Sequence, residues 1–340
     1  MKIEPLKLLG SKPTRHGFGE GLVALGEENE NVVVLGADIT GSVLTSFFQN
    51  RFPERFFSIG IAEQNATTIA VGLALSGKIP FFSSYSAFAA FRNADQMRIS
   101  VCYNEANVKI GGGHSGITVG PDGATHQSLE EISFLRSLPN MTLIVPCDYH
   151  EAKKATIAAG RMTGPVYIRF GRSAVPMFTT EETPFEIGKA QIFREGSDIA
   201  IIACGLMVWQ ALLAAEELEK RKGISARVIN LATIKPIDVE TVTLAARQCG
   251  VIVTAEEHQI FGGMGSAVAE VVVKNCPVPM EFIGIPDRFG ESGEPDELLE
   301  KLGLTWREIY NGCLTALKRK KSEFSSFRRP TDLTFENKEV

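Results

Sequence analysis

The sequence predicts an α/β protein with two consecutive doubly wound domains whose sheets are mainly parallel. Its 340 residues exceed the length of one ordinary domain. Short apolar runs alternate with helix-sized segments along most of the chain. The runs lack two-residue alternation, as strands buried on both faces do. We expect domains at 11–178 and 185–318, followed by a charged tail at 319–340 that lies on the surface or is partly disordered.

Six apolar runs are the expected strands of the first domain. They are VVVL from residue 32, FFSI from 56, IPFF from 79, VKIG from 108, LIVP from 143 and VYIRF from 166. Helix-sized segments lie between them at 62–76, 89–103 and 149–160. This order is typical of a doubly wound sheet with helical crossovers.

A second series follows the polar segment 179–184. Its expected strands are IAIIA from residue 199, ARVINL from 226, VIVTAEE from 251 and MEFIGI from 280, with helices at 210–222, 239–248 and 263–274. Glu256, Glu257 and His258 end one of these strands, ahead of a GGMG segment that opens a helix. We interpret this arrangement as tight packing of strand against helix, and we predict no chemistry in this domain.

Composition narrows the class of protein. The chain is 44% hydrophobic and carries a net charge of −5, which argues against an extended nucleic-acid groove. Its six cysteines show no zinc-ligand spacing, so we expect reduced thiols, no metal site and a cytoplasmic location. The longest apolar stretch, 199–209, is too short to cross a bilayer, so we expect no membrane role.

Four polar loops follow predicted strands of the first domain, where open α/β sheets bind ligands. They cover residues 36–42, 61–65, 83–88 and 111–127. The last holds six glycines together with His114, Asp122 and His126. Two histidines twelve residues apart fit no common zinc site, so the pattern favours proton transfer or hydrogen bonds to hydroxyls. The alternative is a glycine-rich loop whose histidines bond only to backbone, and the loop alone leaves both open.

Glu63 and a run of aromatic residues complete the pattern. Glu63 lies in the first turn of a predicted helix, where the helix dipole alone explains a carboxylate. Phe82, Tyr85, Phe88 and Phe91 recur every three residues, which by itself is typical of a core stripe. An acid, an aromatic platform and a histidine loop in that order are more specific than any one of them.

These features give the chain a resemblance to a known family. From residue 14 to about 311 it resembles the C-terminal half of a transketolase, which comprises the pyrimidine-binding and C-terminal domains of a thiamine diphosphate enzyme. The motifs are GIAEQN at 60–65, Phe82, Tyr85 and Phe88 in an F-x-x-Y-x-x-F pattern, DGATHQ at 122–127 and IRFGRSAVP at 168–176.

The resemblance implies a partner. In full-length transketolases a preceding domain binds Mg²⁺ (or Ca²⁺) and the diphosphate through a Gly-Asp-Gly motif followed later by Asn, and this sequence contains no GDG. The chain therefore resembles the second subunit of a split transketolase. We expect the first subunit to carry the GDG…N motif and most of the metal site, in an α2β2 heterotetramer.

The resemblance also implies roles for individual residues. The acid that hydrogen-bonds N1′ of the aminopyrimidine is Glu63, and Phe82, Tyr85 and Phe88 form the stacking pocket with Tyr85 as its central platform. Asp38 and Ile39 lie against the cofactor. The expected substrate contacts are Arg15, Ser42, His114 and Arg172 for the sugar phosphate, with Asp122 and His126 near the reacting carbonyl and hydroxyls. Glu63, His114 and His126 are the expected catalytic residues.

The implied reaction is transfer of a two-carbon ketol unit from a ketose phosphate to an aldose phosphate, as in the pentose phosphate pathway. A 1-deoxyxylulose-5-phosphate synthase is the first alternative, since such enzymes share GIAEQ and DGxTH but usually carry Asp where His114 stands. The β subunits of 2-oxoacid dehydrogenases lack the DGxTHQ run. A catalytically silent assembly subunit is the non-enzymatic alternative, although it has no physical need for this set of side chains.

Overall fold

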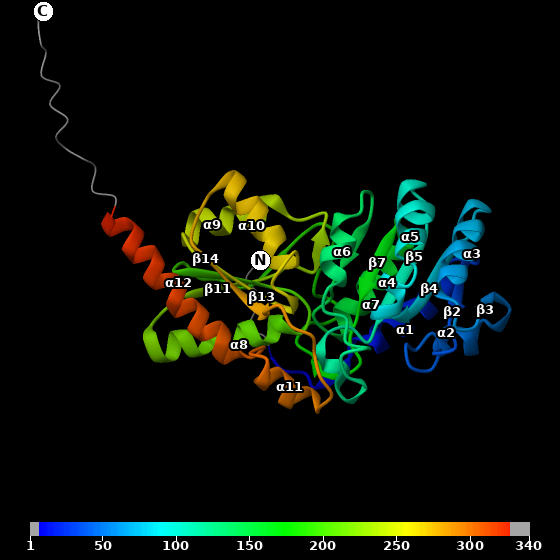
Figure 1. The fold of residues 1–340 in the computed structure, drawn as a ribbon, viewed down its shortest axis with the longest axis horizontal. Helices are drawn as coiled ribbons and strands as arrows, with labels where there is room; N and C mark the ends of the chain where they lie inside the picture. Colours follow the sequence, from blue (N-terminus) through cyan, green and yellow to red (C-terminus); the bar gives the residue numbers. More distant parts are fainter. Residues whose placement is uncertain (1–6, 327–340) are drawn as a thin grey trace, which may run out of the picture.

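The computed structural model describes residues 7–326, with side chains up to residue 320. Two lobes, each a sheet flanked by helices, lie side by side along the long axis of the molecule (Figure 1). The first lobe contains the N-terminal half of the chain and the second contains the C-terminal half. The predicted fold class, two mainly parallel α/β domains in tandem, is confirmed.

The first sheet has seven strands in the order β12-β6-β7-β5-β4-β2-β3. Its strands are β2 (Val32–Gly36), β3 (Phe56–Ser58), β4 (Ile79–Tyr85), β5 (Lys109–Gly113), β6 (Thr142–Ile144), β7 (Val166–Arg169) and β12 (Thr233–Lys235). All six predicted runs are strands of this sheet, and they pair in parallel. The seventh strand, β12, comes from the second half of the chain and pairs antiparallel with β6.

The helices of the first lobe are α1 (Thr14–Glu28), α2 (Ser46–Arg51), α3 (Glu63–Leu75), α4 (Ser86–Phe91), α5 (Ala94–Gln96), the π-helix Met97–Tyr103, α6 (Glu131–Ser137) and α7 (Tyr149–Arg161), with 3-10 turns at Pro53–Arg55 and Ile117–Asp122. The helix predicted at 89–103 is therefore broken. The break falls at Asn93, whose backbone is not helical and whose buried side chain donates to the Thr67 hydroxyl at 2.5 Å.

Helix α1 was not among the predicted elements. Its sequence is rich in glycine, which is a poor helix former. The glycines allow α1 to pack closely on α7. A Cβ added at Gly17 would lie 2.2 Å from the Tyr149 carbonyl oxygen, and one at Gly21 would lie 2.7 Å from Thr156 Cβ. Tertiary packing therefore overrides local propensity in this helix.

The second sheet has five strands in the order β14-β13-β10-β11-β9. These are β9 (Gln191–Arg194), β10 (Ile199–Ala203), β11 (Ala226–Asn230), β13 (Ile252–Gln259) and β14 (Met280–Ile285), all parallel to their neighbours except β9. Its helices are α8 (Met207–Lys222), α9 (Val239–Cys249), α10 (Met264–Asn275), α11 (Pro295–Lys301) and α12 (Trp306–Ser326). Helices α9 and α10 cover one face of this sheet, and α8 and α12 cover the other (Figure 1).

Two further features bear on the chain ends and the lobe contact. Helix α12 continues past residue 319, so the first part of the predicted tail is helical, and residues 327–340 lie outside the described part. A short antiparallel pair joins β1 (Ser11–Pro13) to β8 (Ala174–Pro176).

One apolar core cluster includes Phe82 and Tyr167 of the first lobe and Ala200 of the second, so the lobes share a core.

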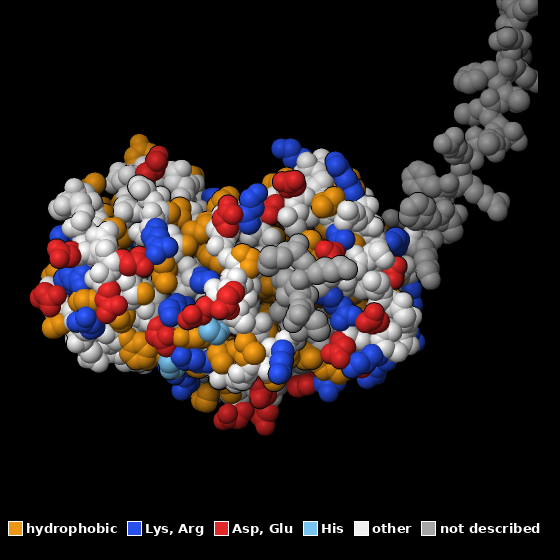
Figure 2. All heavy atoms as spheres, turned by 180° about the vertical axis from the view of Figure 1, so that it is seen from behind, with side chains coloured by type: hydrophobic (Ala, Val, Ile, Leu, Met, Phe, Trp, Pro, Cys, Tyr) orange, Lys and Arg blue, Asp and Glu red, His pale blue; other side chains and the backbone are white. Residues whose placement is uncertain are grey.

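The surface mixes charged and apolar side chains. On the face shown in Figure 2, acidic, basic and apolar side chains are interspersed, and no continuous basic groove crosses the described residues of that face. Among residues 7–326, no helix is both long and apolar enough to span a membrane.

Candidate active site

The predicted loops meet at one edge of the first sheet. Strands β5, β4, β2 and β3 are consecutive neighbours and all parallel, so their carboxyl ends lie along the same edge. Each of these ends leads into one of the predicted loops. The topology therefore brings together four segments that are far apart in the sequence, as we expected.

The buried carboxylate of Glu63 is the centre of this edge. Glu63 is the first residue of α3 and is 4% exposed. Its Oε1 accepts a hydrogen bond from the Ser84 hydroxyl at 3.3 Å and another from Arg92 Nη1 at 3.1 Å. Ser84 belongs to β4, and Arg92 follows α4. Glu63 is a predicted site residue, whereas Arg92 lies outside every predicted motif.

The aromatic run divides into three environments. The rings of Tyr85 and Phe88 are half-buried, with centroids 5.9 Å apart, and both can face a ligand. Phe82 is fully buried in the core cluster, so it lies beneath the site and offers no surface to a ligand. Phe91 is exposed and packs at the rim against Phe134. Of the three predicted pocket residues, Tyr85 and Phe88 are partly exposed and Phe82 is buried.

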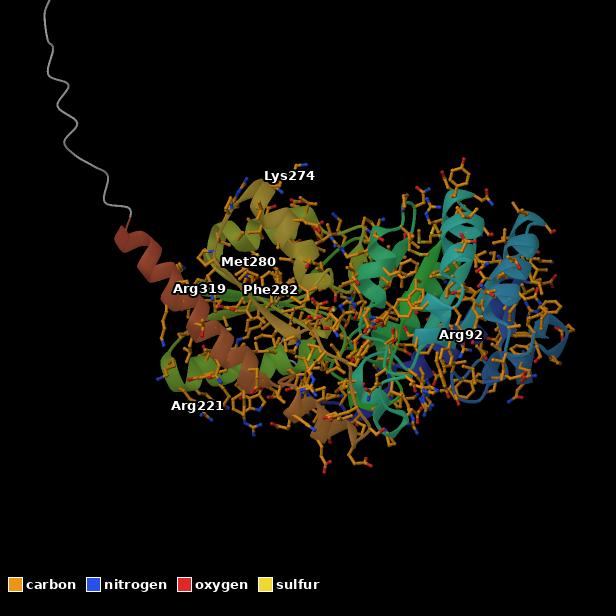
Figure 3. All side chains as sticks on the ribbon, viewed as in Figure 1. Arg92, Arg221, Lys274, Met280, Phe282 and Arg319 are labelled. Atoms are coloured by element: carbon orange, nitrogen blue, oxygen red, sulfur yellow. The ribbon has the colours of Figure 1, made fainter. Side chains whose placement is uncertain are left out.

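Arg92 already lies against this pocket. Its guanidinium carbon is 3.7 Å from the centre of the Phe88 ring, and its Nη1 holds Glu63. Figure 3 labels Arg92 beside the cyan helices of the first lobe. One flat cation therefore bridges the predicted acid and the predicted aromatic platform.

Both histidines of the glycine-rich loop converge on the aromatic pair. The His114 ring lies 4.2 Å from the Tyr85 ring, and the His126 ring lies 5.3 Å from Phe88 and 5.9 Å from Tyr85. His114 follows β5 with a φ of +53° and is 2% exposed, and its Nδ1 is buried without a hydrogen-bond partner in the described structure. His126 Nδ1 shares a hydrogen bond of 2.9 Å with the Thr125 hydroxyl.

The electrostatics around His114 are cationic. Burial, together with the nearby Arg15, Arg172 and His126, lowers the pKa of His114 to about 3. Burial also lowers the pKa of Arg15, with a second contribution from Arg172. His114 is therefore a neutral imidazole at ordinary pH, in reach of two guanidinium groups. Such a cluster attracts an anion.

The two arginines also bind the chain itself. Arg15 Nη1 donates to the Ser42 carbonyl at 2.8 Å. Arg172 Nη1 donates to the Val119 carbonyl at 2.9 Å and lies 3.6 Å from an Asp122 carboxylate oxygen. The first contact joins the start of α1 to the loop after β2, and the second joins Arg172 to the histidine loop. They engage one nitrogen of each guanidinium, so further donors remain for a ligand.

Asp38 and Ile39 stand on the loop after β2. Asp38 is exposed with a φ of +59°, and its Oδ1 accepts from the Ser58 hydroxyl at 3.3 Å. Ile39 is half-buried against an apolar cluster that contains Phe18. The recorded contacts of Asp38 and Ile39 are thus with neighbouring loop and core residues rather than with Glu63.

The second lobe reaches the histidine loop through Glu257. This carboxylate on β13 is 5% exposed, and its Oε1 accepts from both the backbone N–H and the hydroxyl of Thr118 at 2.8 Å. Burial raises the pKa of Glu257. Glu256, in contrast, accepts from the N–H groups of Met264 and Gly265 at the start of α10, which is the tight packing we predicted. Glu257 lies in an apolar run of the sequence, and a carboxylate in such a run needs a hydrogen-bond partner. That pattern could have pointed to Glu257.

A buried ion network supports the same region. Arg169, at the end of β7, donates to Glu131 Oε1 at 2.6 Å and to the Glu257 carbonyl at 2.8 Å. Its Nη1 is also 3.8 Å from the Glu257 carboxylate. Ser86 donates to the same oxygen of Glu131 at 3.3 Å. The histidine loop, α6 and β13 are therefore connected through charged side chains.

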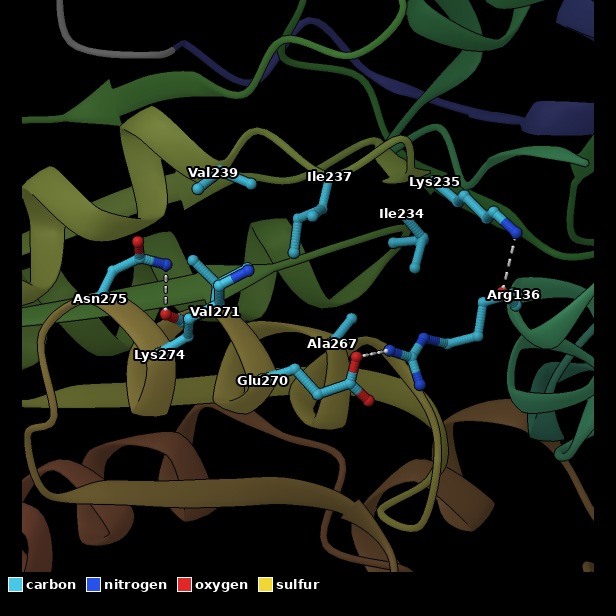
Figure 4. Close-up of a pocket in the computed structure, with 10 residues that line it drawn as sticks. All are labelled: Arg136, Ile234, Lys235, Ile237, Val239, Ala267, Glu270, Val271, Lys274 and Asn275. Atoms are coloured by element: carbon cyan, nitrogen blue, oxygen red, sulfur yellow. Dashed lines mark hydrogen bonds and ion pairs between the residues drawn. The ribbon is translucent and has the colours of Figure 1, made fainter. Parts of the chain in front are cut away.

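A separate cavity lies between the lobes (Figure 4). It has a volume of about 420 Å³ and is lined by Arg136, Ile234, Lys235, Ile237, Val239, Ala267, Glu270, Val271, Lys274 and Asn275. Arg136 is paired there with Glu270 at 2.6 Å, and Lys235 donates to the Arg136 carbonyl at 3.1 Å. None of the predicted site residues lines this cavity, so the sheet edge remains the candidate active site.

The two lobes match known family models in sequence. Residues 11–177 match the model described as "Transketolase, pyrimidine binding domain", and residues 188–309 match "Transketolase, C-terminal domain". The chain therefore belongs to the transketolase family, whose enzymes depend on thiamine diphosphate. The resemblance seen in the motifs is confirmed.

The relatives include single-chain halves of transketolases. The "Putative transketolase C-terminal section" of Methanocaldococcus jannaschii is 46% identical over 91% of this chain and 97% of the relative. A "6-deoxy-6-sulfo-D-fructose transketolase subunit" of Clostridium sp. is 42% identical over 90% of this chain and 95% of that subunit. A solved structure described as "Split gene transketolase, inactive beta4 tetramer" has a TM-score of 0.84 at 45% identity, over 92% of this chain and all of that one.

A related group is longer than this chain. The 1-deoxy-D-xylulose-5-phosphate synthase 1 of Geobacter sulfurreducens is 41% identical over 88% of this chain, which covers 48% of that enzyme. The chain thus corresponds to about half of such a synthase.

Proposed function

We propose that this chain is one subunit of a two-chain transketolase, which transfers a two-carbon ketol unit from a ketose phosphate to an aldose phosphate. The observation that carries the proposal is the meeting of Glu63, the Tyr85–Phe88 pair and the His114 loop at one sheet edge. The kinship with transketolase subunits of similar length supports it.

The site fits the aminopyrimidine of thiamine diphosphate. That ring is flat, carries an exocyclic N–H group and needs a carboxyl partner at a ring nitrogen. The Arg92 guanidinium is also flat and rich in N–H groups, and it lies against both Glu63 and Phe88. A group of this shape can therefore be accommodated between the acid and the aromatic face.

Different residues of this chain would then make different contacts with the cofactor. Glu63 would hydrogen-bond the ring nitrogen and hold or move a proton there, while Tyr85 and Phe88 would pack against the ring. Asp38 and Ile39 would bound the site from the neighbouring loop. When bound, thiamine diphosphate supplies the carbon nucleophile that attacks the ketose carbonyl.

The cationic loop suits a phosphorylated substrate. Arg15 and Arg172 would meet the phosphate with the N–H groups left by their backbone contacts, and the unpartnered Nδ1 of His114 could bond a phosphate or hydroxyl oxygen. The Ser42 hydroxyl would add a further contact. Asp122 and His126 would face the hydroxyls and the carbonyl of the sugar.

The proposed partner is a chain equivalent to the N-terminal half of a transketolase, with a GDG…N motif that binds Mg²⁺ (or Ca²⁺) and the diphosphate. Within the described residues, no group of three or more histidine, cysteine, aspartate or glutamate side chains could hold a metal ion. We place the pair in an α2β2 heterotetramer in the cytoplasm, with domains of this chain at 11–178 and 185–318.

The second candidate is a 1-deoxyxylulose-5-phosphate synthase, favoured by the kinship with the Geobacter enzyme. A mixing experiment separates the candidates. The chain is combined with a GDG-bearing first subunit and assayed for ketol transfer between sugar phosphates and for condensation of pyruvate with glyceraldehyde 3-phosphate. Ketol transfer supports the proposal, condensation alone supports the synthase, and neither activity in a cofactor-loaded complex supports a silent assembly subunit.

A further inference from the structure

We propose that Arg92 is a built-in plug of the aminopyrimidine position, which the cofactor must displace when it binds. The proposal rests on the proposed function, in which Glu63 and Phe88 receive the aminopyrimidine. It adds a role for a residue that lies outside the motifs on which the resemblance rests.

Arg92 uses the same two groups as the proposed ligand. Its Nη1 lies 3.1 Å from Glu63 Oε1, and its guanidinium carbon lies 3.7 Å from the centre of the Phe88 ring. A guanidinium is planar, presents N–H donors in its plane and stacks on aromatic faces. In shape and hydrogen bonding it imitates the edge of an aminopyrimidine. In the proposal the aminopyrimidine takes this oxygen and this face of Phe88, so it binds there only when Arg92 has left them.

The Arg92 side chain can leave this place while its backbone stays fixed. The Arg92 side chain is 46% exposed, whereas Glu63 is 4% exposed. The next residue, Asn93, is fully buried and anchored to Thr67 on α3. An ion pair with one half-exposed partner is weak, because water solvates the cation when it is released. Arg92 can therefore swing outward without a change in the helices around it.

Cofactor binding at this site would then depend on displacement of Arg92. If Arg92 covers the subsite most of the time, the apparent affinity for the pyrimidine falls in proportion to the fraction of open molecules. A partner that binds the diphosphate adds enough affinity to displace the arginine. The plug also keeps the acid and the aromatic face of the lone subunit from other flat cations.

Thiamine, the cofactor without its diphosphate, tests the plug on the isolated chain. Its affinity is measured by calorimetry for the wild type, Arg92→Ala and the control Arg98→Ala, an exposed arginine in the π-helix Met97–Tyr103. We expect Arg92→Ala to bind thiamine at least tenfold more tightly, and Arg98→Ala to behave as the wild type. Equal affinities for wild type and Arg92→Ala, or no measurable binding to Arg92→Ala, would overturn the plug.

A double variant separates the plug from the function on which it rests. Glu63→Gln is added to Arg92→Ala, with melting temperatures recorded to show that each chain is folded. A gain from Arg92→Ala that is lost on adding Glu63→Gln supports both ideas. If Glu63→Gln alone weakens thiamine binding and Arg92→Ala changes nothing, the plug is wrong and the pyrimidine site stands. If neither substitution alters binding, both are wrong.

Discussion

Glu63 is the residue on which the proposed chemistry depends most directly, since it is the buried acid beside the aromatic pair. Replacement by Gln keeps the shape and the contact with Ser84 but removes the acid. We predict that Glu63→Gln in the assembled enzyme keeps its fold and loses about 10²- to 10⁴-fold in kcat. The direct measurement is exchange of the C2 proton of bound thiamine diphosphate. Unchanged exchange in a folded, cofactor-loaded variant would show that another residue is the acid.

Arg172 tests phosphate recognition. Its hydrogen bond to the Val119 carbonyl and its position near Asp122 also suit an arginine that only braces the loop. We predict that Arg172→Ala lowers kcat/KM by roughly 10- to 100-fold for phosphorylated sugars, because a hydrogen bond to a charged group is worth about 1.5–3 kcal/mol. Unphosphorylated erythrulose should suffer much less.

The comparison of substrates decides between the two roles of Arg172. Equal losses with phosphorylated and unphosphorylated donors would identify it as a brace. The matched control is His126→Ala, which should reduce turnover with every donor because its ring lies beside Phe88 and Tyr85, where the reacting carbonyl is expected.

His114 should make stability depend on pH. Its pKa is about 3 in the folded chain against an ordinary 6.5, so between these values the unfolded chain binds a proton that the folded chain does not. Stability therefore falls as the pH falls through this window, by up to about 2 kcal/mol at pH 5. Asn tolerates the positive φ of this position. We predict that urea unfolding of His114→Asn shows a smaller loss between pH 7 and pH 5, and an identical loss would contradict the assignment.

At the scale of elements, the Arg169 network holds the candidate site to both lobes. Burial lowers the pKa of Arg169, but Glu131 and Glu257 outweigh this effect and raise it overall. Replacing Arg169 with Met would leave two buried carboxylates without their cation. We predict a loss of about 3–5 kcal/mol in the free energy of unfolding, measured with denaturant.

The matched control for Arg169 is Arg161→Met. Arg161 pairs with Glu28 at the surface, where both side chains are exposed, and such pairs contribute about 1 kcal/mol or less. Similar small losses for both variants would mean that the buried network does not stabilise the fold.

The elements differ in how well their sequences predict them. The six strands predicted in the first domain and the four in the second could be found because each is a short apolar run between polar loops, as Val32 to Leu35 illustrates. Helix α1 could not, since its glycines are poor helix formers and are explained only by the close approach of α7. Strand β12 could not either, because it pairs with β6 of the other lobe rather than with a neighbour in sequence.

The residues of the candidate site also differ in how well the sequence predicts them. Glu63, Tyr85 and the two histidines could be predicted because each lies in a short motif after a strand. Phe82 shares the spacing of the other aromatics, but it lies in the middle of β4, where the side chains on both faces are buried. Arg92 and Glu257 reach the site only through tertiary contacts with Glu63 and Thr118, which no local pattern encodes.

At the scale of the whole molecule, both lobes present exposed apolar side chains. Large apolar side chains that are more than half exposed include Ile61, Leu75 and Tyr103 on the first lobe, and Phe261 and Phe289 on the second. Ile61 is two residues from the buried acid Glu63. Single exposed apolar side chains are ordinary on protein surfaces, and only a contiguous patch indicates a binding surface.

We predict that the isolated chain does not turn over sugar phosphates and binds thiamine diphosphate weakly, because the proposed diphosphate and metal site lies on the partner. Coexpression with a GDG-bearing first subunit should give a complex with the mass of two copies of each chain, measured by light scattering, and activity should appear with that mass. Full activity from this chain alone would contradict the two-chain enzyme.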